Sequence, residues 1–307
     1  MLGFSRHPSS SAWVGCAPEG ALAHLACVDR KPGSAPSVRW ASTEPWTDAT
    51  ASLRSLRRSR KLSQHRRVGL LQRGQYQLLP MDAPDVPRED WKQALRWQLK
   101  DLVDFAVDSA AIDLLELPAG GGGRAQARVL AVAAPQAQVR PLAQWAEDAG
   151  TPWQAIDIPE IALRNISALV EPAGRAQALL HFADSGLLVV TQDGELLLSR
   201  AIDVSALQLG SEDAEARQQA FDRAGLELQR TLDSFERQFS HLSLARLLVA
   251  PGPAMEAFCT YLAEMLYAPV SLLDLGDRLD LSAVAALADP QVLGTHLRAI
   301  GAALRGG

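Results

Sequence analysis

The stretch ALLHFADSGLLVVTQDGELLLSRA, residues 178–201, carries the clearest β-hairpin pattern in the chain. Its two β-rich runs flank Asp193-Gly194, a dipeptide that favours a tight primed turn between antiparallel strands. Helices and short buried strands alternate after the hairpin, which is the pattern of a sheet packed against helices. We expect them at residues 212–240 (helix), 244–250 (strand), 255–267 (helix), 270–275 (strand) and 290–304 (helix).

The beginning of the chain shows a similar order of elements. Short apolar runs separated by turn signals predict three strands. We place these strands at residues 12–16, 21–29 and 37–42. A helix at 48–62 and a strand pair at 68–72 and 76–79 follow them. Two halves that each open with strands indicate a two-lobed α/β protein and an ancient duplication, although no residue-level repeat accompanies the pattern.

The sequence pattern changes at Pro80, and the segment that begins there predicts an inserted α/β subdomain. Its expected elements are a helix at 88–102, a strand at 110–117, a flexible link at Gly120–Gly123, a strand at 129–134, a helix at 136–149 and a strand at 153–158. We therefore assign residues 1–173 to the first lobe, with the insertion at about residues 80–158, and residues 174–307 to the second lobe. We expect the last helix to pack back on the first lobe.

Composition excludes several classes of function. The chain of 307 residues is 48% apolar and 21% charged, which fits a globular protein, and its net charge of -5 argues against a nucleic-acid partner. The cysteines Cys16, Cys27 and Cys259 form no C-x-x-C pair, so we expect neither a disulfide framework nor a zinc site. The N-terminal residues MLGFSRHPSSSAW lack the apolar core of a signal peptide. We expect a cytoplasmic protein, or one attached to a membrane only at its surface.

Several stretches in a fixed order resemble the actin-like pilus biogenesis proteins of the PilM type, and more closely the MshI branch linked to MSHA pili. They are residues 93–117, 129–150, 156–164, 196–202, 226–239 (LELQRTLDSFERQF, the most specific) and 247–275. The resemblance implies an actin-like (ribonuclease H-like) fold of two lobes facing a cleft. It also implies a scaffold role: binding the N-terminal cytoplasmic tail of a PilN-like inner-membrane pilus protein, and through it, indirectly, the assembly motor ATPase.

This sequence differs from those of actin-like ATPases at the positions of the phosphate-binding turns. Such turns use a D-x-G pattern, since aspartate holds Mg²⁺ through water and glycine leaves room for the ligand. In the first turn Ala17 stands where the aspartate is expected, and Pro18 removes an N–H donor. In the second, His181 occupies the aspartate position and Ala183 the glycine position. We therefore expect no catalytic residues, no metal site and a degenerate nucleotide site.

A weak nucleotide site stays open as an alternative. Asp184 and Gly186 have D-x-G spacing, shifted by three residues, and Gly252 lies between two prolines near the last strands. With ATP and magnesium as cofactors, these residues would contact the phosphates and the nucleoside. The alternative function is thus an active actin-like ATPase.

The sequence also predicts two interaction surfaces. Seven basic residues without an acid between them suggest contact with anionic lipid headgroups; they are Arg54, Arg57, Arg58, Arg60, Lys61, Arg66 and Arg67. A solvated helix end would give the same pattern. Trp91, Leu95 and Tyr76 are candidates to line a groove for the partner peptide, although Trp91 and Leu95 at helical spacing also suit a core.

Overall fold

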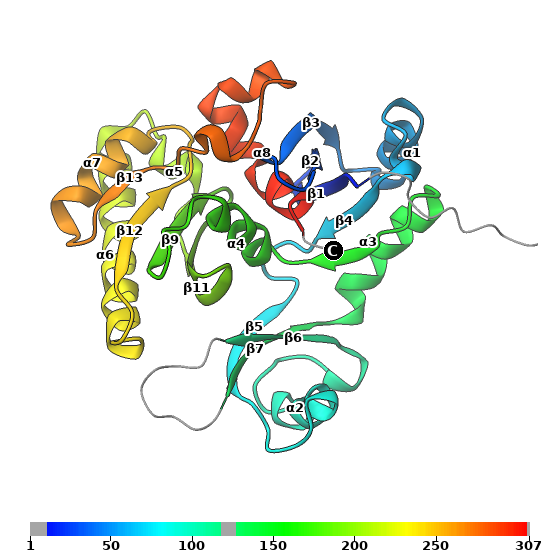
Figure 1. The fold of residues 1–307 in the computed structure, drawn as a ribbon, viewed down its shortest axis with the longest axis horizontal. Helices are drawn as coiled ribbons and strands as arrows, with labels where there is room; N and C mark the ends of the chain where they lie inside the picture. Colours follow the sequence, from blue (N-terminus) through cyan, green and yellow to red (C-terminus); the bar gives the residue numbers. More distant parts are fainter. Residues whose placement is uncertain (1–10, 118–126, 306–307) are drawn as a thin grey trace, which may run out of the picture.

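The computed structural model describes residues 11–117 and 127–305, and these contain one five-stranded sheet in each lobe (Figure 1). The first sheet has the order β3-β2-β1-β4-β8 and the second the matching order β11-β10-β9-β12-β13. In each sheet three antiparallel strands are joined by two parallel ones. The similar order of elements in the two halves of the sequence thus reappears in the strand pairing. The Gly120–Gly123 link lies outside the described residues.

Strands and helices have the following bounds. The first-lobe strands are β1 (Trp13–Glu19), β2 (Leu22–Asp29), β3 (Ser37–Pro45), β4 (Arg66–Leu70) and β8 (Ala155–Asp157). The second-lobe strands are β9 (Ala176–Phe182), β10 (Gly186–Gln192), β11 (Glu195–Ile202), β12 (Leu244–Val249) and β13 (Val270–Leu272). The α-helices are α1 (Ala49–Ser59), α2 (Trp91–Leu99), α3 (Gln136–Asp148), α4 (Pro159–Val170), α5 (Ala206–Leu209), α6 (Ala214–Gln238), α7 (Met255–Met265) and α8 (Pro290–Ala303).

The inserted subdomain is a three-stranded sheet that carries α2. Its strands pair in the order β5-β7-β6, with β5 at Gln77–Asp82, β6 at Ala111–Leu117 and β7 at Arg128–Ala134. The three-stranded sheet and α2 span residues 77–134, whereas the expected insertion ran over about residues 80–158. The insertion starts with β5, and α3 and β8 belong to the first lobe, because β8 pairs with β4 and α3 packs on α1. The expected strand pair at 68–72 and 76–79 is wrong, since β4 pairs with β1 and β8 while β5 pairs with β7.

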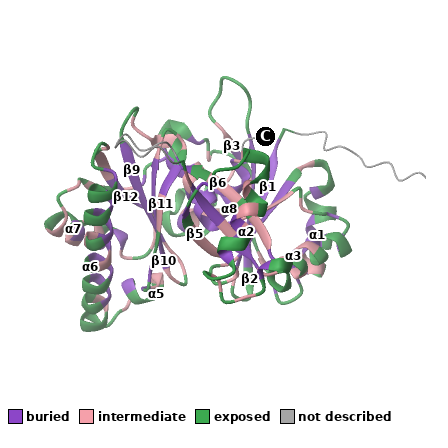
Figure 2. Ribbon diagram, turned by 90° about the horizontal axis from the view of Figure 1, so that it is seen from below, coloured by how far each residue is buried: buried purple, intermediate pink, exposed green. Residues whose placement is uncertain are grey.

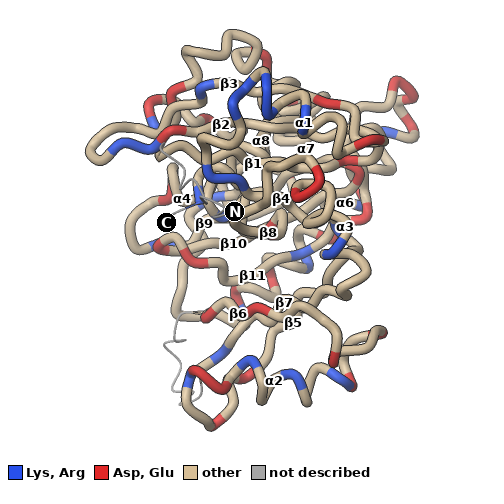
Figure 3. The backbone as a smooth tube through the Cα atoms, turned by 90° about the vertical axis from the view of Figure 1, so that its right-hand side faces the viewer, with Lys and Arg blue, Asp and Glu red and all other residues tan. Residues whose placement is uncertain are grey.

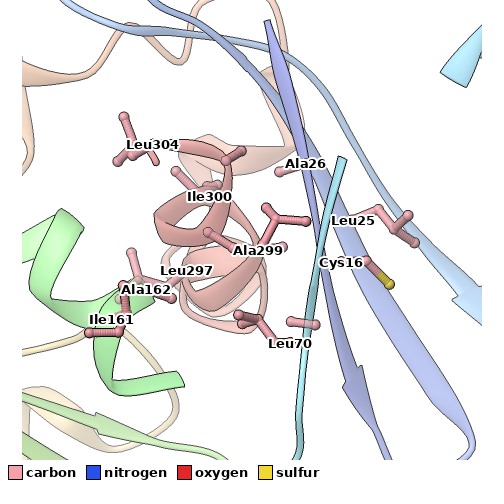
Figure 4. Close-up of a cluster of buried hydrophobic side chains, with 14 of the residues drawn as sticks. Cys16, Leu25, Ala26, Leu70, Ile161, Ala162, Leu297, Ala299, Ile300 and Leu304 are labelled. Atoms are coloured by element: carbon pink, nitrogen blue, oxygen red, sulfur yellow. The ribbon is translucent and has the colours of Figure 1, made fainter. Parts of the chain in front are cut away.

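A pair of helices, α4 and α8, occupies the space between the two large sheets (Figures 1 and 4). Helix α8 contacts β1, β2 and α4, while α4 contacts the second-lobe strands β9, β10 and β11. Leu297 and Ile300 of α8 are fully buried, and Figure 4 shows the α8 side chains between α4 and the first-lobe strands. One cluster of buried residues takes side chains from both lobes, while the second lobe and the inserted subdomain each have a further core of their own (Figure 2).

Glycines allow α8 to approach its neighbours at backbone distance. A Cβ added at Gly15 of β1 would lie 2.1 Å from the Ala299 carbonyl oxygen, and one at Gly301 would lie 2.1 Å from that of Ala162 in α4. A Cβ at Gly294 would lie 2.0 Å from the carbonyl oxygen of Pro251, which follows the second-lobe strand β12. The same helix is thus in close backbone contact with both lobes.

Candidate functional site

The three segments that correspond to the nucleotide-binding turns meet in the cleft between the lobes. The end of β1 contributes Pro18 and Glu19, and the turn after β9 contributes Ala183 and Asp184. Two adjoining cavities, of about 150 and 550 Å³, lie between these turns, and Gly252 lines the larger one. The structure therefore brings together Asp184 and Gly252, which the sequence proposed as one weak site.

Ionic groups of the protein itself occupy the middle of this cleft. Arg298 of α8 forms an ion pair with Glu19, and His24 lies 3.7 Å from the same carboxylate. From the segment after β4, Arg73 donates hydrogen bonds across the cleft to the hydroxyl of Ser185 (2.8 Å) and the carbonyl oxygen of Gly186 (3.0 Å). The first lobe is thereby linked directly to the second-lobe turn.

His181, which replaces the expected aspartate, is buried at the end of β9. Its Nε2 lies 3.0 Å from the carbonyl oxygen of Gly294, to which it donates a hydrogen bond in the neutral form protonated at Nε2. Burial, reinforced by the charge of Arg298, lowers the pKa of His181 to about 3, so the ring is neutral at physiological pH. A neutral imidazole bonded to a backbone carbonyl serves to join β9 to α8 and does not replace a metal-binding carboxylate.

Magnesium and ATP are the groups that the fold family implies, and the cleft residues do not fit them. Two carboxylates, Glu19 and Asp184, line the cavities, but Glu19 already pairs with Arg298, so no pair of free carboxylates faces them. Gly186 is enclosed, because a Cβ there would lie within 2.9 Å of Phe182 and Ile202 side chains. Across residues 11–117 and 127–305, no three His, Cys, Asp or Glu side chains are placed to hold a metal ion.

A second concave region, the interdomain groove, lies between the first-lobe sheet and the inserted subdomain. It has a volume of about 270 Å³ and an apolar floor that includes Leu115, Val132, Val139 and Ile156. Asp113 and Asp157 also line it. Both sheets end here, since β8 is an edge strand of the first-lobe sheet and β6 is an edge strand of the three-stranded sheet.

The candidate partner residues Trp91, Leu95 and Tyr76 do not come together in this groove. Leu95 is fully buried in the core of the inserted subdomain, and Trp91 packs against that core while its Nε1 bonds to the carbonyl of Val86. Tyr76 is buried and its hydroxyl donates a short hydrogen bond to the carboxyl of Glu160. These three side chains therefore stabilise the subdomain and its junction with the lobes.

The buried carboxyl of Glu160 is located where the first lobe, the insertion and the second lobe meet. A cavity of about 400 Å³ at this junction is lined by Tyr76, Glu160, Arg73 and Ser199. Burial raises the pKa of Glu160, and the hydrogen bond from Tyr76 only partly opposes that effect. Burial raises the pKa of Tyr76 as well, so its hydroxyl stays a donor.

Sequence reasoning missed the residues that define both concave regions. Arg298 carried a usable signal, because it is a charged residue within an otherwise apolar stretch of the last helix, between Leu297 and Ala299. Arg73 carried none, since a basic residue before a glycine is typical of any exposed turn. Asp113 and Ile156 come from strands far apart in the sequence, and only the tertiary structure shows that they line one groove.

The two matching sheets, the cleft between them and the inserted subdomain define an actin-like ATPase fold. No protein-family model matches the chain, and no curated protein sequence does. Among solved structures, a chain of the PilM–PilN type IV pilus biogenesis complex is similar to it, with a TM-score of 0.75 and 17% identity over 97% of this chain and 98% of that one. The predicted resemblance to the PilM type is thus confirmed as a likeness of fold.

Two further structures have the same fold. The cytoplasmic domain of EpsL, an inner-membrane component of the Vibrio cholerae type II secretion system, has a TM-score of 0.51 at 13% identity, with 97% of each chain covered. A Bacteroides thetaiotaomicron protein with an actin-like ATPase fold and unknown function has a TM-score of 0.50 at 10% identity, with 89% of this chain and 94% of that one covered. The predicted actin-like, two-lobed α/β fold is therefore confirmed.

Proposed function

We propose that the chain is a non-catalytic scaffold of a type IV, MSHA-like pilus assembly machine. It binds the N-terminal cytoplasmic tail of a PilN-like inner-membrane protein, and it is held in the cytoplasm at the inner membrane through that partner. The likeness to a chain of the PilM–PilN complex supports the type of partner. The assembly motor ATPase is reached indirectly, through this membrane platform. Every helix in the described residues is too short or too polar to cross a bilayer.

The observation that carries the proposal is the interdomain groove, which has the features of a site for an extended peptide. Its apolar floor suits alternate apolar side chains of a strand, and the edge strands β6 and β8 supply backbone groups beside it. Asp113 and Asp157 provide negative charge at the same place, although Lys92 pairs with Asp113 at 2.6 Å and Arg305 pairs with Asp157. Because both carboxylates are already paired with cations of the chain, the groove suits a short segment with apolar side chains at alternate positions.

The cleft supports the non-catalytic part of the proposal. The Arg73 hydrogen bonds link the first lobe to the second-lobe turn, and the Glu19–Arg298 pair ties α8 to β1 beside them. With these contacts made by its own side chains, the chain keeps its two-lobed shape without a bound nucleotide.

The experiment is calorimetric titration of the purified protein with a synthetic N-terminal tail of a PilN-like inner-membrane protein. The Ala111→Arg variant places a long side chain in the groove and should weaken binding by about tenfold or more. Ala137→Arg makes the same change on the exposed face of α3, away from the groove, and should bind like the wild type. No saturable heat with the wild type, or equal affinity for both variants, would refute the assignment of the groove.

A further inference from the structure

A fixed positive surface covers the outer side of the first lobe, formed by the C-terminal part of α1, the turn after it and the start of β4. Two of its cations bond to the end of α3: Arg54 donates to the carbonyl oxygen of Asp148 (3.0 Å) and Arg57 to that of Ala149 (3.4 Å). The helix beneath is anchored by the buried side chains of Leu53 and Leu56. We call this region, residues 54–66, the α1 surface.

Aromatic rings hold two more of the cations on the α1 surface. The guanidinium of Arg60 lies 5.3 Å from the ring centre of Trp40, and that of Arg66 lies 5.5 Å from the ring centre of Trp13. Each contact fixes the side chain and so reduces the entropy that it loses when an anion binds. The surface is therefore arranged before any partner arrives.

None of these contacts neutralises the positive charge. Carbonyl oxygens and aromatic rings are uncharged, and no basic residue of the α1 surface forms an ion pair with a carboxylate of the described residues. The inserted subdomain differs, because Arg88, Lys92 and Lys100 there each pair with an acid. A concentrated positive surface on a chain of net charge -5 calls for an anionic partner.

Helix α3 connects the α1 surface to the interdomain groove. Helix α1 packs on α3, and Val139 of α3 lines the groove. Figure 3 views the molecule from the side on which α1 and α3 lie in Figure 1, and it shows Lys and Arg around α1. On α3, Trp145 is 37% exposed and its ring packs edge-on against Trp46. Tryptophan beside cations is typical of surfaces that contact the headgroup region of a bilayer.

We propose that the α1 surface docks this protein directly on anionic lipid headgroups, with the groove turned toward the membrane so that a short tail can enter it. The choice of lipid over another polyanion rests on the proposed function, which places the partner in the inner membrane. The contact is electrostatic and peripheral. It gives the scaffold a second attachment besides the peptide, and the two act together because each raises the local concentration of the other.

The test uses the full chain and sedimentation with vesicles, without any partner peptide. Vesicles of phosphatidylcholine alone are compared with vesicles that contain about 30% phosphatidylglycerol, at low and high salt. Arg58 and Lys61 are the residues to change, because they are exposed and no hydrogen bond of either side chain is recorded in the described structure. Arg58→Gln preserves helix propensity, and Lys61→Asn suits the left-handed backbone there, where φ is 51°.

The expected result is binding to the anionic vesicles that weakens with salt. Each basic residue at such a surface contributes about fivefold to partitioning, so Arg58→Gln/Lys61→Asn should bind about 25-fold more weakly. Arg223→Gln/Arg230→Gln removes the same charge from exposed positions on α6, on the opposite side of the molecule in Figure 1, and should bind like the wild type.

Three outcomes would overturn the proposal: no binding to anionic vesicles, equal loss in both double variants, or equal binding to neutral vesicles. Salt-sensitive self-association that disappears in Arg58→Gln/Lys61→Asn, measured by sedimentation velocity without vesicles, would assign the α1 surface to a second copy of the chain instead. Because no peptide is present, failure here leaves the proposed function standing, and failure of peptide binding leaves the vesicle result standing.

Discussion

Replacing Gly294 with alanine tests the close contact between α8 and the second lobe. The added Cβ would lie 2.0 Å from the carbonyl oxygen of Pro251, whereas contacts below 3.0 Å are essentially never found. The two backbones must therefore separate by about 1 Å. Pro251 resists this movement, because the N–H of Ala250 bonds to the carbonyl of Leu180 at 2.7 Å and Pro253 restricts the chain two residues later.

The expected cost follows from two opposing effects. Overpacking of backbone against backbone costs about 3 kcal/mol, and the better helix propensity of alanine returns about 1 kcal/mol. The Gly294→Ala variant should thus lose about 2 kcal/mol of unfolding free energy. The bond between His181 Nε2 and the carbonyl of Gly294 should lengthen with it, since it crosses the same contact.

Gly225→Ala in α6 is the matched control. Its Cβ would lie 2.8 Å from Cε of Met265 and 2.9 Å from Cε1 of Tyr261, which are the ends of side chains that can rotate away. The propensity gain of about 1 kcal/mol then offsets the small rearrangement, and the stability should match that of the wild type or exceed it. Helix α6 is continuous through this glycine.

Urea denaturation followed by circular dichroism and tryptophan fluorescence measures both variants. The transition midpoint should fall for Gly294→Ala and should not fall for Gly225→Ala, with unchanged slopes. If Gly294→Ala proved as stable as the wild type, α8 could not lie against Pro251 as described, and the argument that one helix joins the lobes would fail.

Three further predictions concern the cleft and the junction. Burial holds the pKa of Glu160 above its ordinary value of 4.5, so its contribution to stability is complete below pH 4.5 and decreases as the pH rises toward the folded-state pKa. Glu160→Gln should remove that decrease in stability, and Tyr76→Phe should deepen it, because the carboxyl then lacks its hydrogen-bond donor. Urea denaturation midpoints of the wild type and the two variants, measured between about pH 5 and 8, test this. Midpoints that change with pH in parallel for all three proteins would contradict it. Arg298→Met should lower the free energy of unfolding by about 2 kcal/mol, because it leaves Glu19 unpaired. Adding Glu19→Gln should restore part of that loss. Strictly additive losses in urea denaturation would show that the two side chains do not interact. Titration with ATP and Mg²⁺ should give no saturable heat; clear binding that is lost in Asp184→Ala would instead establish a nucleotide site at Asp184, as the alternative requires.

The sequence predicted the two-lobed architecture well because each lobe opens with three consecutive strands that pair with their chain neighbours, which local turn signals can indicate. The hairpin at Asp193-Gly194 forms as expected, with β10 and β11 paired across it. The insertion was misplaced because β5 and β4 are adjacent in sequence yet pair with distant strands, and local pattern cannot distinguish a hairpin from a crossover. Residues 153–158 were likewise assigned to the nearest subdomain instead of to the first-lobe sheet.

Candidate sites were harder to predict than the fold. The three cleft segments could be named because turn positions in an actin-like fold are fixed by the strands before them. The side chains that fill the cleft could not be predicted, because its arginines come from a turn and from α8, and no sequence motif marks either element. Tyr76 and Leu95 were predicted to line a groove but are buried in cores. An aromatic or apolar residue has the same sequence signal in a core as in a groove.

Helix α8 has a consequence for how the chain acquires its structure during synthesis. The strands β1 and β2 leave the ribosome early, yet the helix that covers them is synthesised after every other element described above. The second lobe can bury most of its own sheet with α6 and α7 as it emerges, so it completes its core before the first lobe does. During translation the apolar face of β1 is therefore exposed for a long interval, and shortening the chain before residue 290 should leave the first lobe prone to aggregation.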